Sequence, residues 1–427
     1  MHSVHSTEVA QAVPATPPGT IPTFATPSTN NAAWAEPGTS AYRRISLALF
    51  LAGFATFSLL YCVQPLLPLF AADFHVSAAA SALALSFSTG CLAFAILCAG
   101  ALSENLGRRM LMFTSMALAA LLNIAAALVP GWHALLVLRA LEGLALGGVP
   151  AVAMAYLAEE IHPRGLGRAM GLYVAGTAFG GMVGRVGMSL LTDFHSWRMA
   201  LAVVGAVDLL AAIGFVLLLP PSRHFTRKRG FDLAYHLGAW GSHLRHPALP
   251  LLFAVGFLVM GMFVTVYNYA GFRLMRAPFN LSQGSIGLIF TAYLFGIAAS
   301  AMAGGWADRR GRAPVLLAGL GLAALGVLLT LPASLPLMVL GIVLITFGFF
   351  VSHSVASAWV GRLGGSAKGH AASLYLLAYY LGSSMLGAMG GWFWEHAGWS
   401  AVAGYALLLL AITVAAALAL RHRAAAR

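Results

Sequence analysis

The chain has 427 residues, of which 60% are hydrophobic and only 8% are charged. This composition excludes an ordinary water-soluble domain, because so much apolar surface must face lipid. The formal net charge of +12 would suit a nucleic-acid-binding protein, but the basic residues are spread along the chain and form no single patch, so we expect no nucleic-acid partner.

The chain begins with a polar segment. Residues 1–41 contain no Lys or Arg and are rich in Pro, Thr, Ser and Ala. They lack the basic start of a secretory signal, and their composition is typical of disorder. We therefore expect residues 1–43 to form a disordered tail.

Twelve apolar runs follow this tail. A helix needs about 20 apolar residues to cross a bilayer, so each run predicts one transmembrane helix and the fold class is an all-α membrane protein. The runs lie at about 45–70, 79–102, 110–129, 134–157, 169–191, 199–219, 248–272, 286–306, 315–335, 337–360, 371–393 and 401–420.

The basic residues between the runs predict the orientation of the helices. Of the 24 Lys and Arg residues, 19 fall in segments that would share one side of the membrane with both termini, 3 fall on the other side, and 2 lie inside helices. Because basic loops stay in the cytoplasm, both termini should be cytoplasmic, including the tail at 421–427.

Two sets of matched residues indicate an internal duplication. At an offset of 204, Gly100, Glu104, Gly107 and Arg108 match Gly304, Asp308, Gly311 and Arg312. At an offset of 202, Tyr173, Gly180, Asp193 and Trp197 match Tyr375, Gly382, Glu395 and Trp399. We therefore predict two pseudo-symmetric six-helix bundles at 44–219 and 248–420, joined by a cytoplasmic loop at 220–247.

Four acidic or basic residues of the Asp, Glu, Lys and Arg types lie within the apolar runs. Arg139, Glu142, Arg185 and Asp208 each cost about 2.5–3.5 kcal/mol at the centre of a membrane helix, so each requires an explanation. Arg139 and Glu142 are three residues apart and share a helix face, where they can neutralise each other. Glu142 and Asp208 both fall near the middle of the bilayer and are candidates to carry a proton, while a buried ion pair that only fixes packing is the alternative.

Two parallel six-helix repeats are the plan of one large transporter class, with a substrate site between the halves. The chain resembles the major facilitator superfamily. Residues 100–108 are similar to that family's first cytoplasmic loop signature, and Arg139-Ala-Leu-Glu142-Gly143 is similar to its helix-four signature with Glu in place of Gln. The resemblance implies that Arg139 takes part in proton coupling.

The duplicated loop residues predict a gate. A glycine lets two helix ends approach closely, and an acid beside arginines can form a latch between helices at the cytoplasmic rim. The resemblance implies that this latch holds the inner side closed, whereas arginines that only orient the protein are the alternative. The predicted gate residues are Gly100, Glu104, Gly107, Arg108, Asp308, Gly311 and Arg312.

Polar side chains from several helices reach a similar depth and could line a common chamber. Helix five carries Gly176, Gly180 and Gly184 at a spacing that allows close helix contact, followed by Arg185, a cation suited to an anionic substrate. The predicted substrate residues are Tyr61, Gln64, Arg185, Tyr267, Asn268, His353, Tyr379 and Tyr380.

The segments Gly180-Gly-Met-Val-Gly-Arg185 and Gly348-Phe-Phe-Val-Ser-His353 resemble the bacterial acriflavine-sensitivity or arabinose-efflux-like subgroup. The resemblance implies a monomeric inner-membrane transporter in the lipid bilayer that exports a small molecule in exchange for protons. Proton-coupled uptake of a small organic anion is the first alternative, and a membrane receptor or enzyme scaffold is the second. We expect no enzymatic activity, cofactor or metal, because Cys62, Cys91 and Cys98 lack metal-ligand spacing and no nucleotide-binding loop is present.

Overall fold

The computed structural model describes residues 34–222 and 233–425, without the side chains of residues 100–106, 151, 233, 366 and 423–425. Most of the predicted tail, part of the predicted loop at 220–247 and the side chain of Glu104 therefore lie outside the described residues. The described part is helical apart from turns and one isolated bridge between Ala35 and Ile161.

The first half of the chain contains eight α-helices. They are α1 (Ser40–Tyr61), α2 (Leu67–Asp73), α3 (Ala78–Leu106), α4 (Arg108–Leu128), α5 (Trp132–Leu146), α6 (Pro150–Glu160), α7 (Pro163–Phe194) and α8 (Trp197–Leu218). A 3₁₀ turn, Gln64–Leu66, connects α1 to α2.

The second half begins with α9 (Leu233–Arg245), which lies inside the predicted connecting loop. It continues with α10 (Leu249–Leu274), α11 (Gln283–Gly287), the 3₁₀ segment η2 (Leu288–Ala292), α12 (Tyr293–Arg310), α13 (Arg312–Leu329), α14 (Leu335–Leu363), α15 (Lys368–Leu381), the π-helical segment η4 (Gly382–Leu386) and α16 (Gly387–Ala425).

Ten helical stretches of the described residues are long and apolar enough to cross a membrane. The predicted fourth pass is not among them, because it is broken into α5 and α6, which have 15 and 11 residues. The stretch Lys368–His422 contains two predicted passes, which meet where Ala397 and Gly398 leave the helical conformation. With these two differences in continuity, the helices confirm the predicted fold class.

The break between α5 and α6 has a local cause. Pro150 has no N–H to donate to a preceding turn, and it follows Gly147 and Gly148, which favour irregular backbone. A side chain on Gly147 would collide with Ala95 of α3, and one on Gly148 would collide with Ser115 of α4. The glycines therefore allow α3 and α4 to approach the fourth pass closely where its helix is interrupted.

The duplicated loops end their helices later than the sequence indicates. The predicted gate requires Gly100 and Gly304 to stand where their helices end, but both lie inside α3 and α12, so this part of the prediction is wrong. The helices stop at Gly107 and Gly311 instead, whose φ angles of 85° and 86° are favourable only for glycine. The acids at 104 and 308 consequently belong to the last helical turn before the loop.

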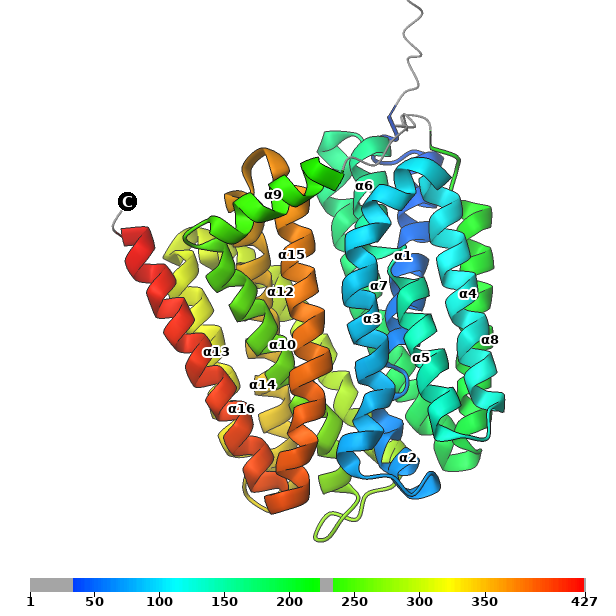
Figure 1. Cartoon of the computed structure of the whole chain (residues 1–427), viewed down its shortest axis with the longest axis vertical. Helices are drawn as coiled ribbons and strands as arrows, with labels where there is room; N and C mark the ends of the chain where they lie inside the picture. Colours follow the sequence, from blue (N-terminus) through cyan, green and yellow to red (C-terminus); the bar gives the residue numbers. More distant parts are fainter. Residues whose placement is uncertain (1–33, 223–232, 426–427) are drawn as a thin grey trace, which may run out of the picture. The chain divides into compact units, whose positions relative to one another are not determined.

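Both halves pack their helices in the same way. In the first half, α1 packs on α7, α3 on α5 and α4 on α8; in the second half, α10 packs on α15 and α16, α12 on α14 and α13 on α16. Figure 1 shows the first set, blue to green, beside the second set, green to red. A side chain on Gly180 would strike the backbone of Phe54, and one on the matched Gly382 would strike that of Phe257.

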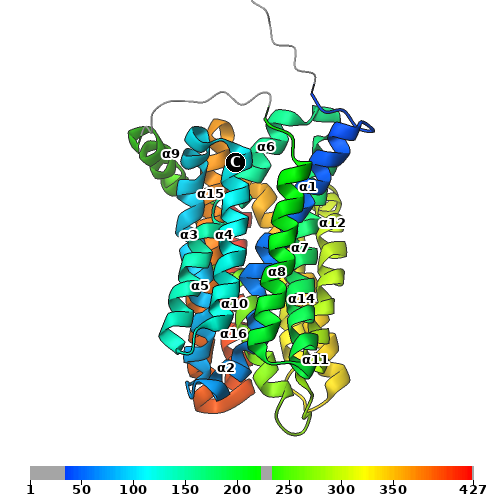
Figure 2. The same ribbon diagram turned by 90° about the vertical axis from the view of Figure 1, so that its right-hand side faces the viewer.

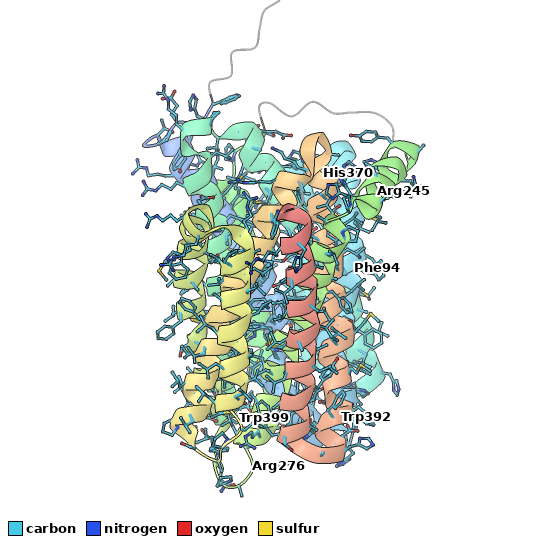
Figure 3. All side chains as sticks on the ribbon, turned by 90° about the vertical axis from the view of Figure 1, so that its left-hand side faces the viewer. Phe94, Arg245, Arg276, His370, Trp392 and Trp399 are labelled. Atoms are coloured by element: carbon cyan, nitrogen blue, oxygen red, sulfur yellow. The ribbon has the colours of Figure 1, made fainter. Side chains whose placement is uncertain are left out.

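The two ends of the bundles differ in their surroundings. We call them the α9 end and the α2 end, after the helices that lie there in Figures 1 and 2. Figure 3 shows Arg245 and His370 at the α9 end, Arg276, Trp392 and Trp399 at the α2 end, and Phe94 on the side of the bundle between them. Phe94 is 57% exposed, as expected of an apolar side chain that faces lipid.

Candidate functional site

A cavity of about 150 Å³ lies between the two halves, lined by residues of α1, α7, α10, α12, α14 and α15. Five predicted substrate residues line it, namely Tyr61, Arg185, His353, Tyr379 and Tyr380. Gln64, Tyr267 and Asn268 do not line it; they are buried immediately beside it and make hydrogen bonds to other side chains.

Most of the remaining cavity wall is aromatic. Phe263 of α10 stacks on Phe349 of α14, with ring centroids 3.9 Å apart. His353, one helical turn further along α14, stacks on Phe349. Its Nδ1 and the hydroxyl oxygen of Tyr375 are 3.0 Å apart and form a hydrogen bond. The wall therefore offers large flat apolar surfaces with a few polar atoms.

Among the described residues, Arg185 is the one arginine whose side chain lines the cavity. Its Nε donates to Oε1 of Gln64 at 2.7 Å, and its Nη1 donates to the carbonyl of Gly181 at 2.7 Å. The guanidinium carbon lies 4.2 Å from the ring centre of Tyr61 and 4.9 Å from that of Tyr293. No carboxylate among the described residues pairs with it, so aromatic faces and neutral oxygens are what surround this charge.

A polar chain connects Arg185 to the second half of the protein. Gln64 accepts from Arg185 and donates through Nε2 to Oδ1 of Asn268 at 2.8 Å. Gln64 and Asn268 are 204 residues apart, which is the offset of the first repeat, so they are equivalent residues of the two halves. Arg185 is thus held by a hydrogen-bonded pair that spans the interface between the bundles.

Arg139 and Glu142 lie within the first bundle and do not line the cavity. Both side chains are completely buried, and Nη1 of Arg139 donates to Oε2 of Glu142 at 2.5 Å. Arg139 also donates to the carbonyls of Ala84, Leu59 and Leu60. The other carboxylate oxygen of Glu142 has no hydrogen-bond partner within the described part of the chain.

The carbonyls that Arg139 binds are available because α1 stops at Tyr61. Pro65 cannot donate an N–H, and the chain continues in a 3₁₀ turn, so the last carbonyls of α1 need other partners. Arg139 supplies N–H groups to two of them. It therefore holds the broken end of α1, at the residues that precede Tyr61 in the cavity wall.

Asp208 of α8 is completely buried, and neither of its carboxylate oxygens has a hydrogen-bond partner among the described residues. Like Glu142, it does not line the cavity. The structure therefore brings Arg139 and Glu142 together but leaves Asp208 outside their hydrogen-bonded group.

Polar contacts between the halves gather at the α2 end. Asp193, at the end of α7, accepts from the N–H of Gly284 at 2.8 Å and from the hydroxyl of Ser282 at 3.2 Å. Its repeat equivalent Glu395 accepts from the N–H of Ala79 at 2.8 Å. Each acid thus binds the beginning of a helix in the opposite half, and these symmetric contacts join the two halves at the α2 end.

The predicted gate residues at the α9 end make a different pattern. Arg108 pairs with Glu159 inside the first half, and Arg362 pairs with Asp308 at 3.4 Å inside the second half. Both described pairs therefore connect helices of the same bundle. Neither joins the two halves in this structure, in contrast to the polar contacts at the α2 end.

The apolar packing agrees with this difference. One continuous core cluster contains residues of the second half together with first-half residues such as Leu66, Phe70 and Met188 near the α2 end, and it extends along α3 as far as Ile96. A separate cluster, with Leu49, Met112 and Phe215, fills the first half toward the α9 end. Packing between the halves is therefore continuous at the α2 end and interrupted toward the α9 end.

Several cavity residues were not predicted from the sequence, chiefly Phe57, Phe263, Tyr293, Phe349 and Phe350. They are apolar or weakly polar residues within apolar runs, and the sequence does not distinguish an aromatic residue that faces lipid from one that faces a cavity. The available signal was the spacing of aromatic residues along the second half, such as Phe349 and His353 four residues apart on one helix face.

The chain is similar to known membrane proteins over most of its length. The sequence model of the Major Facilitator Superfamily matches residues 49–275 and 269–427. The inner membrane transport protein YnfM of Escherichia coli (strain K12) is 46% identical over 90% of this chain and 92% of its own length. The uncharacterized MFS-type transporter YybF of Bacillus subtilis (strain 168) is 43% identical over 88% of this chain and 93% of its own length.

A solved structure shares the same arrangement of helices. The crystal structure of the nucleoside transporter NupG (D323A mutant) superposes with a TM-score of 0.72 and covers 87% of this chain and 99% of that one, at 15% sequence identity. At this identity the likeness concerns the fold alone. Together with the match of the family over nearly all the apolar helices, it shows that the chain is a multi-pass membrane transporter of the major facilitator superfamily.

Proposed function

We propose that the protein exports a small organic molecule across the bacterial inner membrane in exchange for protons, by alternating access of the cavity to the two sides. The observation that carries this proposal is the cavity between the two bundles, together with the contacts of Asp193 and Glu395 that join the bundles at the α2 end. We assign the α9 end to the cytoplasm, because its loops hold most of the Lys and Arg residues. The proposed transporting unit is a monomer, whose two bundles enclose the cavity between them.

In this proposal the structure corresponds to an inward-facing state. Opening toward the other side would separate Asp193 from Gly284 and Glu395 from Ala79, and would bring the α9 ends of the bundles together. The predicted latch would act in that second state, in which Arg108, Asp308 and Arg312 could meet residues of the opposite bundle. Substrate and protons must favour different states, since a ligand with equal affinity for both would shift nothing.

Glu142 and Asp208 are the proposed proton sites. Arg139 donates to Glu142 and also to the carbonyls of Leu59 and Leu60. These two residues immediately precede the cavity residue Tyr61 in the chain. Protonation of Glu142 would remove its charge from Arg139, and the end of α1 is the element best placed to respond. Asp208 is a candidate because an unpaired carboxylate is costly to bury and a proton would remove that cost.

Uptake of a small organic anion is the second candidate function, favoured by the unpaired charge of Arg185 in the cavity. Everted membrane vesicles separate the two, because their outer surface is the cytoplasmic one. A panel of solutes is first screened by thermal shift on detergent-purified protein. Each hit is then offered to vesicles with an acidic or an alkaline interior.

An exporter that exchanges cargo for protons accumulates the solute when the vesicle interior is acidic. Coupled uptake with protons instead gives accumulation when the exterior is acidic. Glu142→Gln should abolish the dependence on the gradient while leaving binding of the solute in place. Failure of every binding solute to show counterflow would contradict transport and favour a receptor or a scaffold for an enzyme.

A further inference from the structure

We propose that the cavity binds a small aromatic organic anion, whose negative group meets Arg185 and whose ring lies against the aromatic wall. The inference rests on the proposed function in one respect, namely that this cavity is where cargo binds. It adds the chemical class of the cargo, which follows from the charge and the shape of the cavity.

The charge of the cavity is the first argument. Arg185 is 2% exposed and lies in a membrane helix, where an isolated charge is costly. Its described partners are Gln64, Gly181 and aromatic rings, all of them neutral. Arg139, in the same bundle, has a carboxylate at 2.5 Å. A bound anion would give Arg185 the counter-charge that the protein itself gives to Arg139.

The donor geometry is the second argument. Nε and Nη1 of Arg185 each donate one hydrogen bond to the protein, and a guanidinium has five N–H groups in one plane. The bond from Nε to Gln64, which is itself held by Asn268, fixes the orientation of that plane. The remaining N–H groups suit the two oxygens of a carboxylate, which arginine binds in a planar, bidentate manner.

The absence of acids from the cavity wall excludes the opposite class of cargo. None of the residues that line the described cavity is Asp or Glu, while Arg185 lies among them. An organic cation would therefore meet a like charge with no carboxylate to compensate it, which is the kind of mismatch by which sites reject ligands.

The shape of the wall is the third argument. Phe263 and Phe349 are stacked, and His353 continues the stack 5.9 Å from Phe349, so that flat faces border the cavity. Aromatic rings prefer stacked or edge-on contacts with other rings. An aromatic carboxylate uses the charge and these surfaces together.

The test compares three probes of equal size on the detergent-purified protein, by calorimetric titration. The probes are 2-naphthoate, the neutral 2-naphthamide and the cationic 2-naphthamidine. We expect 2-naphthoate to bind at least about tenfold more tightly than the amide, since losing a charge-assisted pair costs more than about 1.4 kcal/mol, a factor of ten. The amidine should bind most weakly of the three.

The same titration on Arg185→Gln identifies the residue. We expect 2-naphthoate to lose about tenfold or more in affinity while 2-naphthamide is unchanged, so that the preference for the anion disappears. Arg198→Gln is the matched control, because Arg198 contacts Trp197 and the carbonyl of Val129 and does not line the cavity. If Arg185→Gln does not fold, Arg185→Lys keeps the charge, and its preference for the anion should be reduced but present.

Equal binding of the anion and the amide to the wild type would overturn the inference, and so would full retention of the preference in Arg185→Gln. The outcome is separable from that of the proposed function. Coupled transport of a neutral or cationic solute would leave the proposed function standing and reject the anion. Binding of 2-naphthoate without counterflow of any solute would do the reverse.

Discussion

Arg139 and Arg185 lie in the same bundle, are buried to the same degree and have different surroundings. Arg139 binds Glu142 and three backbone carbonyls, so its charge and its donors are used within the first half. Arg185 binds neutral groups and borders the cavity. Burial alone therefore does not define the role of a charged residue in a membrane helix; the role depends on the groups that neutralise its charge.

Arg139 therefore stabilises the first bundle, whereas the charge of Arg185 is left for a bound anion to neutralise. Removing each arginine should therefore have a different main effect. Arg139 should matter for stability and for coupling, and Arg185 should matter for what the cavity binds. Arg362, an exposed arginine in an ion pair with Asp308, serves as the reference for both substitutions.

The largest expected effect is that of Arg139→Gln on stability. The substitution leaves Glu142 buried without its cation and removes donors from the end of α1. Breaking a buried pair by removing one partner costs about 3–5 kcal/mol. Thermal denaturation in detergent should show a marked loss of melting temperature, and a variant as stable as the wild type would contradict the role given to Arg139.

The double variant Arg139→Gln, Glu142→Gln should recover part of that loss. Replacing both members of a buried ion pair is often close to neutral, because no charge is left uncompensated. Recovery should be incomplete, since the carbonyls of Leu59 and Leu60 still lack the guanidinium. The same denaturation series with Glu142→Gln completes a double-mutant cycle, and simple additivity of the two single effects would argue against a coupled pair.

Arg185→Gln should cost less than Arg139→Gln. It removes two hydrogen bonds from a charged group, worth about 1.5–3 kcal/mol each, but it also removes a buried charge that has no acidic partner among the described residues, and the two effects oppose each other. The melting temperature without ligand should change little, whereas the stabilisation by 2-naphthoate should disappear. A loss of stability as large as that of Arg139→Gln would show that Arg185 is used for packing.

The smallest effect is expected for Arg362→Gln at the α9 end. Arg362 is 63% exposed and lies 3.4 Å from Asp308, which is 68% exposed. Exposed ion pairs contribute about 0–1 kcal/mol and are screened by salt. Denaturation at low and high salt should barely distinguish this variant from the wild type, and a loss above about 2 kcal/mol would contradict a peripheral role for the pair in this state.

The fold was largely accessible to sequence reasoning, since hydropathy and repeats are local signals. The matched Gly107 and Gly311 adopt the same positive φ in equivalent loops, and the matched Gly180 and Gly382 mark equivalent close contacts between helices. The interruption between α5 and α6 was not predicted, because a long apolar run hides a break that only neighbouring helices make necessary.

The site was accessible only where polar residues occur in apolar runs. Tyr61, Arg185 and His353 were found in this way. Phe349 was missed because it has the same chemistry as the lipid-facing Phe94, and the two differ in which neighbour covers them. The hydrogen bond between Gln64 and Asn268 was also missed, although their spacing of 204 equals the repeat offset and could have indicated that they meet at the symmetry axis.

Counterflow of radiolabelled 2-naphthoate in proteoliposomes without a pH gradient tests the central claim most directly. The account predicts that the wild type and the double variant Arg139→Gln, Glu142→Gln exchange the anion, since exchange needs the cavity but no net movement of protons. Arg185→Gln should lose exchange. Exchange by Arg185→Gln at the wild-type rate, or its loss in a folded double variant, would contradict the division of roles between the two arginines.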